Sequence, residues 1–192
     1  MNAPQWITAD RLTATFTAIM AITGLLALGL AYRQLRQDNE EAQVQHLLDF
    51  DHQFVSEPMI GYRKAYAEKR LKGVVDPDEE YRLLDFFEGI GLLVNRGYLN
   101  DKDVWEDYSY WIFPLYVDTR DMLDQDQKDD PSSYTNFVAL EKRLESIETS
   151  QHGTFARPSK DDLHDVWEYE SSVVPDSPIG HSKRPPVKSP AK

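Results

Sequence analysis

The architecture of this chain is decided by the stretch LTATFTAIMAITGLLALGLAY, residues 12–32. It contains no charged residue and is bounded by Arg11 and Arg33. At 1.5 Å per residue, a helix of this length would be about 30 Å long, which matches the hydrocarbon core of a bilayer. The sequence therefore predicts a single transmembrane helix over residues 12–32.

A cleaved signal peptide is the competing interpretation of this stretch, because Gly29 and Ala31 form a small-x-small pattern near its end. The segment before it carries only Arg11 beside Asp10. The apolar run is also longer than the roughly 7 to 15 residues of a usual signal peptide. A buried helix of a soluble protein is disfavoured, since so small a domain could hardly cover it on all sides. We therefore expect an uncleaved membrane anchor.

The charges around the span predict its orientation. Arg33 and Arg36 follow the apolar run closely, whereas Arg11 alone precedes it. Because basic residues collect on the cytoplasmic side, the bulk of the chain is expected in the cytoplasm.

Small residues recur at helical spacing within the predicted span: Thr13, Thr17, Ala21 and Gly24. Such a stripe allows another membrane helix to approach closely. The alternative is that small residues are simply common in spans, and no strict G-x-x-x-G motif is present. The stripe is thus a candidate surface for helix–helix packing.

Composition limits the remaining possibilities. The chain of 192 residues has no cysteine and a formal net charge of -12. Disulfides, thiolate nucleophiles and thiolate metal sites are therefore absent, and the acidic balance argues against nucleic-acid binding. We expect four parts: a short N-terminal segment (1–11), the span (12–32), a helical cytoplasmic domain (33–148) and a mostly disordered tail (149–192).

Apolar residues beyond the span recur at helical spacing, which predicts an all-α domain, a small helical bundle. A polar helical stalk over residues 33–45 should continue the span, become amphipathic from Val44 onward and stop near Pro58. Further helices are predicted over residues 59–72, over 77–96 after a capping Asp76, and from Asn100 or Asp101 onward. Another helix is expected to begin at Asp130 and Pro131.

The most distinctive stretch is LLDFFEGIGLLVNRGYLNDKDVWEDYSYWIFPLY, residues 83–116. Its pattern resembles a family of small bacterial single-span membrane proteins that contain a domain of unknown function. The residues that carry this resemblance are Phe86, Phe87, Glu88, Gly91, Gly97 and Trp105. The resemblance implies an N-terminal helix in the inner (cytoplasmic) membrane and a helical cytoplasmic domain. It implies no activity and no catalytic residue.

Two residues of this pattern invite a physical interpretation. Gly91 would let another helix backbone approach closely. Glu88 lies at the border of an apolar face without a cationic partner three or four residues away, so it needs a donor from another helix, such as Arg120 or an aromatic hydroxyl or indole N–H. The functional alternative for Glu88 is an acid or base with a raised pKa. We favour the structural role, and we expect the surrounding aromatic residues to form core and not a ligand pocket.

A local excess of basic residues marks the second predicted helix: Arg63, Lys64, Lys69, Arg70 and Lys72. This cluster could face the anionic lipid of the cytoplasmic leaflet. The alternative is neutralisation by Asp118, Asp121 and the acidic stretch 124–130 of the same domain.

The candidate metal-binding and catalytic patterns in the sequence are incomplete. His46 and His52 are six residues apart and point about 120° away from each other on a helix, which excludes a zinc-binding pair of the i,i+4 type. The stretch that begins at Asp124 resembles a calcium loop, but Asp129 replaces the required glycine and Thr135 the final glutamate. We predict no catalytic residue, metal or cofactor.

The tail contains one ordered candidate, a short helix over residues 160–170 that begins with the capping-box spacing of Ser159 and Asp162. Leu163, Val166 and Trp167 would form its apolar face and dock either onto the domain itself or onto a partner. After Ser171 the tail is rich in proline and is expected to be disordered.

Together these patterns predict a membrane-anchored helical interaction or regulatory module and not an enzyme. Its expected partners are membrane lipid and either a second copy of the chain or another membrane protein. The alternative is a membrane-perturbing effector of a bacterial stress or phage-defence system. A third, weaker alternative is an enzyme that uses Glu88 as its acid or base.

Overall fold

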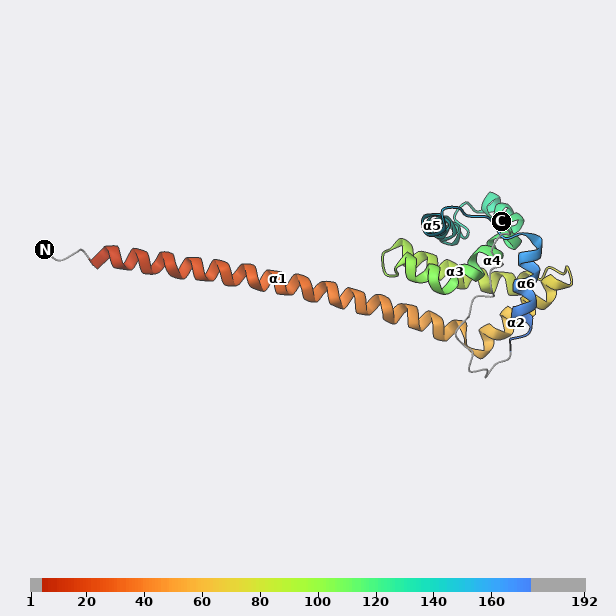
Figure 1. Cartoon of the computed structure of the whole chain (residues 1–192), viewed down its shortest axis with the longest axis horizontal. Coiled ribbons are helices and arrows are strands. Elements are labelled where there is room, and N and C mark those ends of the chain that lie inside the picture. The colour runs from red at the N-terminus through yellow and green to blue at the C-terminus, as the bar shows by residue number, and fades with distance from the viewer. Residues whose placement is uncertain (1–4, 174–192) are drawn as a thin grey trace. The chain divides into compact units, whose positions relative to one another are not determined.

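The computed structural model describes residues 5–173, and within this range the chain forms six α-helices and no strand (Figure 1). Side chains of the first helix are described at positions 13, 14 and 16 onward. The all-α prediction is therefore confirmed over this range. Residues 1–4 of the predicted N-terminal segment, and residues 174–192 of the predicted disordered tail, lie outside the described residues.

The first helix, α1, runs without interruption over Gln5–Phe54 and so includes both the predicted span and the predicted stalk. Every side chain from residue 16 to residue 42 is exposed. The part Phe16–Phe54 is long and apolar enough to cross a membrane by length and composition, a property that it shares with signal sequences.

Residues 1–42 and residues from Gln43 onward form two separate compact units. The second unit contains the end of α1 and all the other helices: α2 (Glu57–Leu71), α3 (Pro77–Asn95), α4 (Asp101–Asp129), α5 (Thr135–His152) and α6 (Lys160–Ser171). Within it α3 packs against α5, α2 against α3 and α6, and α4 against α5. We call this second unit the helical domain.

Local capping signals explain where three helices begin. The Asp76 carboxylate accepts a hydrogen bond from the backbone N–H of Asp78 (3.1 Å) before α3, and Asn100 accepts one from the N–H of Lys102 (2.9 Å) before α4. A capping box formed by Ser159 and Asp162 begins α6. Each bond satisfies a backbone donor that has no partner inside its helix, so these predicted starts are confirmed.

The predicted start of the fifth helix at Asp130 and Pro131 is wrong. Residues 131–134 form a turn, and α5 begins at Thr135. The Asp130 carboxylate accepts hydrogen bonds from the N–H (2.9 Å) and the hydroxyl (2.8 Å) of Ser132, which stabilises the turn instead of a helix. Tyr134 then adopts a left-handed conformation (φ 52°) immediately before α5.

The core of the helical domain is built largely from aromatic side chains, as predicted for the stretch around α3 and α4. Phe54, at the end of α1, lies at the centre of an aromatic cluster, and four ring centroids are 5.3 to 6.0 Å from its own: Phe86, Phe87, Tyr108 and Trp111. Edge-to-face and stacked arrangements at such distances are favourable. The aromatic stripe of α3 and α4 therefore fills the interior, while Tyr81 and Tyr98 remain exposed.

The predicted domain boundary at residue 148 lies too early in the chain. Helix α5 continues to His152, and α6 packs against α2 with Trp167 only 3% exposed. Residues 149–173 thus complete the core, because the Trp167 indole of α6 is buried between Tyr66 of α2 and Trp111 of α4.

Candidate functional site

Glu88 caps a helix other than its own. The residue before α5, Tyr134, offers no side-chain cap. Glu88 on α3 supplies it: Oε1 accepts from the backbone N–H (3.2 Å) and side-chain amide (2.7 Å) of Asn136, and Oε2 accepts from the N–H of Phe137 (2.7 Å). A carboxylate at a helix N-terminus also interacts favourably with the helix dipole. The donors are backbone amides and an asparagine, and not Arg120 or an aromatic group as the sequence suggested.

Gly91 allows this junction to form. A Cβ atom at Gly91 would lie 2.4 Å from the carbonyl oxygen and 2.7 Å from the carbonyl carbon of Asn136. Because these are backbone atoms, they cannot move aside without displacing α5. The predicted close approach at Gly91 is thus confirmed, and the backbone that approaches it belongs to the first turn of α5.

We expect Gly91→Ala to destabilise the helical domain by about 1–3 kcal/mol through overpacking, and Glu88→Ala by about 1–2 kcal/mol through loss of the cap. Urea unfolding of the full chain in detergent, followed by circular dichroism, measures both. Gly61→Ala is the matched control, since a Cβ at this exposed helical glycine would meet nothing within 4 Å. Equal stability of the Gly91→Ala and Gly61→Ala variants would contradict the close contact.

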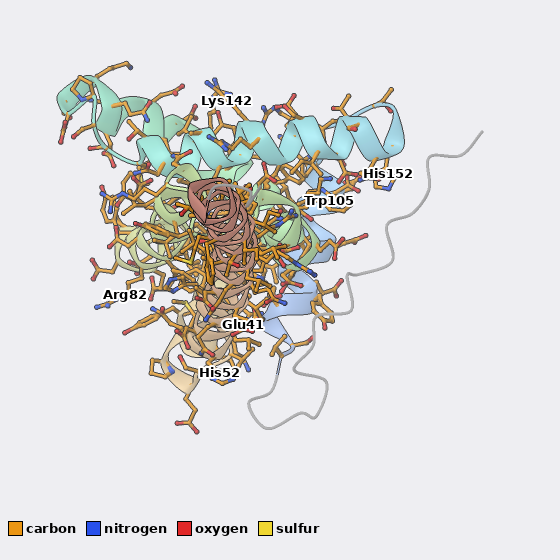
Figure 2. All side chains as sticks on the ribbon, turned by 90° about the vertical axis from the view of Figure 1, so that its left-hand side faces the viewer. Glu41, His52, Arg82, Trp105, Lys142 and His152 are labelled. Carbon is orange, nitrogen blue, oxygen red and sulfur yellow. The ribbon has the colours of Figure 1, made fainter. Side chains whose placement is uncertain are left out.

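Trp105 joins α4 to the end of α5. Its indole N–H donates to Glu148 Oε2 (2.7 Å), and Glu148 Oε1 lies 2.8 Å from Nδ1 of His152. Figure 2 shows Trp105 and His152 side by side, and their ring centroids are 6.0 Å apart. The remaining pattern residues are also placed in the fold: Phe86 and Phe87 lie in the core, and Gly97 (φ +75°) ends α3.

A buried ion pair that the sequence analysis missed joins α2 to α6. Arg63 Nη2 lies 2.7 Å from Glu170 Oε2, and the side chains are 8% and 1% exposed. Arg63 also donates to the carbonyl oxygen of Phe54 (3.1 Å), and the Trp111 indole donates to Glu170 Oε1 (3.0 Å). Burial raises the pKa of the Glu170 carboxyl, while Arg63 and Trp111 oppose this shift. The sequence contained an indication that Glu170 is buried, because it continues the apolar spacing of Leu163, Val166 and Trp167.

Most of the predicted lipid-facing basic cluster is engaged within the helical domain, so that prediction is wrong for three of its five residues. Arg63 is buried as described. Lys69 lies 2.6 Å from Asp76 Oδ2 and 2.8 Å from Glu79 Oε2, while Arg70 pairs with Glu80.

Neutralisation within the domain is correct for these three residues, but of the acids named from the sequence only Asp118 takes part, with Oδ2 3.7 Å from Arg70 Nε. Arg70 also donates to the carbonyl oxygen of Asp118 (3.2 Å). Burial raises the pKa of the Glu80 and Asp118 carboxyls, an effect that Arg70 counteracts. Because α2 packs against α3 and α6, its basic residues meet carboxylates that are distant in the sequence. For Lys64 and Lys72, contact with anionic lipid remains a prediction.

The apolar face of α6 docks onto the helical domain itself. The Trp167 indole donates to Asp118 Oδ2 (2.7 Å), and its ring lies 5.1 Å from that of Tyr66 and 5.2 Å from that of Trp111. Leu163 and Val166 are half-buried against the same core. Of the two docking surfaces considered from the sequence, the structure shows the chain's own domain.

The predicted packing stripe on α1 is exposed. The Thr17 hydroxyl donates to the carbonyl oxygen of Thr13 (2.9 Å), and a Cβ at Gly24 would meet nothing within 4 Å. Ala21 is likewise exposed. No described side chain covers the stripe at Gly24, and its role in helix–helix packing stays a prediction.

Among the described residues, no group of three His, Asp or Glu side chains is placed to hold a metal ion. The ring of His46 meets Tyr98 edge-on with centroids 6.4 Å apart. Within residues 5–173, therefore, neither the His46 and His52 positions nor the stretch that begins at Asp124 forms a metal-coordinating cluster.

One hollow of about 370 Å³ lies between α4, α5 and the segment before α6. Its lining residues are Tyr116, Arg120, Leu123, Asp124, Gln127, Val138, Lys142, Glu145 and Arg157. Arg157 pairs with the carboxylates of Glu141 (2.5 Å) and Glu145 (3.0 Å), and Arg120 lies 3.6 Å from Asp124. Burial raises the pKa of the Glu141 carboxyl, which Arg157 opposes. These cations therefore neutralise the domain's own acids.

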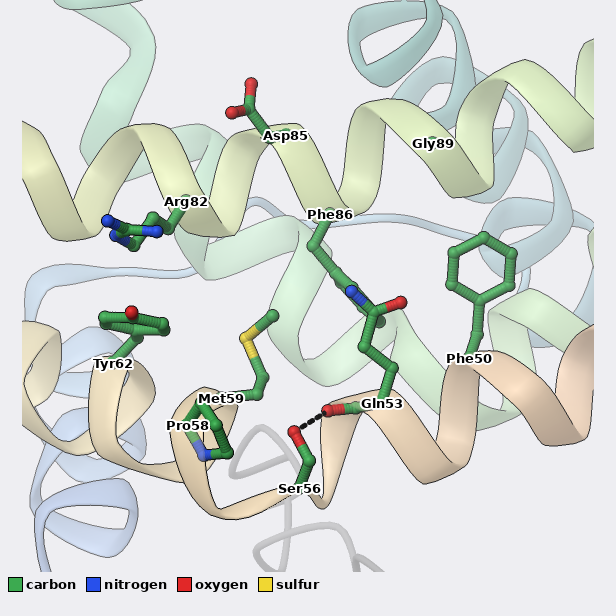
Figure 3. Close-up of a pocket in the computed structure, with 10 residues that line it drawn as sticks. All are labelled: Phe50, Gln53, Ser56, Pro58, Met59, Tyr62, Arg82, Asp85, Phe86 and Gly89. Carbon is green, nitrogen blue, oxygen red and sulfur yellow. Dashed lines mark hydrogen bonds between the residues drawn. The ribbon is translucent and has the colours of Figure 1, made fainter.

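A second hollow of about 370 Å³ lies where the end of α1, the start of α2 and the middle of α3 meet, and we call it the corner groove (Figure 3). Its lining residues are Phe50, Gln53, Ser56, Pro58, Met59, Tyr62, Arg82, Asp85, Phe86 and Gly89. The groove is open to solvent and presents mainly apolar atoms. Such a surface can bind an apolar side chain.

Polar side chains form the rim of the corner groove. The Arg82 guanidinium lies over the ring of Tyr62, 4.6 Å from its centroid. Ser56 donates from its hydroxyl to the carbonyl oxygen of Gln53 (2.7 Å), as Figure 3 shows. Asp85 points away from the groove in this view and accepts a hydrogen bond from the Tyr134 hydroxyl (3.2 Å).

No family model matches the chain, and no curated protein or solved structure is significantly similar to it. The family resemblance of residues 83–116 therefore stays a prediction, and function must be argued from the geometry.

Proposed function

We propose that this chain is a single-span protein of the bacterial inner membrane whose helical domain, a small bundle in the cytoplasm, recognises a protein partner there. The observation that carries the proposal is helix α1, in which every side chain from residue 16 to residue 42 is exposed. Its apolar part would leave many large side chains in water, among them Ile22, Leu25 and Leu28. Lipid is the environment that removes this cost, at about 25 cal/mol for each Å² of apolar surface.

The unbroken helix supports an uncleaved span over a signal peptide. Cleavage after Ala31 would cut α1 in its interior, since the helix continues to Phe54. The partner is a second copy of the chain or another membrane protein, and the stripe from Thr13 to Gly24 is the surface where membrane helices would meet.

Two features of the helical domain favour an interaction module over an enzyme. The Glu88 carboxylate, the one candidate acid or base of the sequence, accepts three hydrogen bonds that hold the N-terminus of α5. The two hollows described above are an apolar groove and a site of internally paired charges. Binding, and not proton transfer, is what these surfaces are suited to.

We expect the chain to stay in the membrane pellet after alkaline extraction and to retain its N-terminal residues. Release into the supernatant, or a mature chain that begins after Ala31, would contradict the membrane anchor. A reporter fused after Val173 should be active on the cytoplasmic side.

Self-association has its own test. In mild detergent the native mass, corrected for bound detergent, should be a multiple of 22.2 kDa or include a further protein. If the stripe mediates self-association, Ala21→Leu with Gly24→Leu should reduce the mass to one copy, whereas Ile22→Ala with Leu26→Ala, on the opposite face of the helix, should not. A monomer without a partner before any substitution would refute the proposed interaction.

A further inference from the structure

The chemistry of the corner groove suits proline. Its floor consists of the rings of Phe50 and Phe86, which meet edge-to-face with centroids 5.6 Å apart, and of the buried thioether of Met59. Tyr62 forms one wall, and Gly89 lies beside the Phe50 ring. Aromatic-lined grooves of this kind bind proline-rich segments in the polyproline II conformation, which needs little ordering on binding.

A series of contacts links the end of the described chain to the segment of α1 that lines this groove. The backbone N–H of Val173 donates to the carbonyl oxygen of Glu170 (3.3 Å). The Glu170 carboxylate binds Arg63, which in turn donates to the carbonyl oxygen of Phe54. Phe54 directly follows Gln53, a lining residue of the groove. The chain therefore leaves α6 at the same α1–α2 junction that forms one side of the groove.

The residues that come next have the matching composition. The sequence after Val173 is VPDSPI, residues 174–179, which contains a Pro-x-x-Pro pattern formed by Pro175 and Pro178. At about 3.1 Å per residue in polyproline II, Pro178 is within about 15 Å of Val173. Asp176 lies between the two prolines, and Arg82 on the rim of the groove offers it an opposite charge.

We propose that residues 174–179 of this chain dock into its own corner groove, with Pro175 and Pro178 against the aromatic floor. The segment then occupies the surface that a proline-rich partner would need, so such a partner must displace it. This inference goes beyond membrane anchoring and does not rest on it, because every lining residue belongs to the helical domain.

The absence of cysteine makes a direct test available, since any disulfide must then arise from introduced residues. In the full chain in detergent, Gly89→Cys combined with Ile179→Cys should form an intramolecular disulfide. Position 89 tolerates a side chain, because its Cβ would lie 3.9 Å from the Phe50 ring, an ordinary contact. Gly61→Cys with Ile179→Cys is the matched control: Gly61 is exposed, close to Arg63 and outside the groove.

We expect the disulfide to position 89 to form at least about tenfold faster than that to position 61, because docking raises the local concentration above that of a flexible tether. Pro175→Ala with Pro178→Ala should abolish the difference, whereas Pro185→Ala with Pro186→Ala should preserve it. Equal rates for positions 89 and 61 would overturn the proposal. So would disulfide-linked dimers as the main product in dilute solution, which would place a second copy in the groove, or a difference that persists without Pro175 and Pro178.

Discussion

Replacement of Glu170 by alanine is expected to destabilise the helical domain by about 3–5 kcal/mol, because it leaves the buried guanidinium of Arg63 without its counter-charge. The side chains of this pair are 8% and 1% exposed, so water cannot take the place of the lost carboxylate. Trp111 loses the acceptor of its indole N–H at the same time. Urea unfolding of the full chain in detergent, monitored by tryptophan fluorescence, measures the change.

Two further variants separate the ion pair from the general cost of a substitution in α6. Glu168→Ala, on the exposed side of the same helix, should change the stability by less than about 0.5 kcal/mol. Arg63→Met combined with Glu170→Leu should recover most of the loss, since a buried ion pair can often be replaced by apolar side chains. A Glu170→Ala variant as stable as Glu168→Ala would show that the pair is not buried as described.

The second large effect is expected from Trp167→Ala, which should cost about 3–5 kcal/mol. The indole is 3% exposed and lies between the rings of Tyr66 and Trp111, so its removal opens a cavity in the core. Trp167→Phe retains most of the packing but loses the hydrogen bond to Asp118, and about 1–3 kcal/mol should be lost.

Hydrogen exchange shows whether this loss is local or global. In the Trp167→Ala variant the amides of α6 should lose protection first, followed by those of α2. His164→Ala, on the exposed side of α6, is the control and should leave protection unchanged. If Trp167→Ala left the protection of α6 intact, the helix would not be held by its indole.

The sequence predicted those parts of the fold that depend on neighbouring residues. The starts of α3, α4 and α6 follow from capping side chains within three residues of each helix, and the all-α class follows from apolar spacing. The short helix after residue 159 was predicted on the same grounds. Its docking onto the domain was only one of two alternatives, because burial depends on which surface the helix meets.

Most of the errors arise from pairing between residues distant in the sequence. The start of α5 was misplaced because Asp130 closes a local turn, and because the cap comes from Glu88, 48 residues before Asn136. The basic residues of α2 were noticed and Asp118 was named among their partners, but the carboxylates on α3 and α6 could not be assigned. The corner groove was not foreseen, since it exists only where three helices meet. Gly91 is the exception, because the lack of a side chain itself indicates close packing.

The position of Glu170 has a consequence for how the protein is made. Arg63 and Glu170 are 107 positions apart, and at 5–20 residues per second a ribosome needs about 5–20 s to add the intervening residues. Throughout that interval the nascent chain contains Arg63 but not yet Glu170, the carboxylate that neutralises it in the folded domain. Chaperones that recognise incomplete cores are therefore expected to retain the nascent chain until the ribosome has added α6.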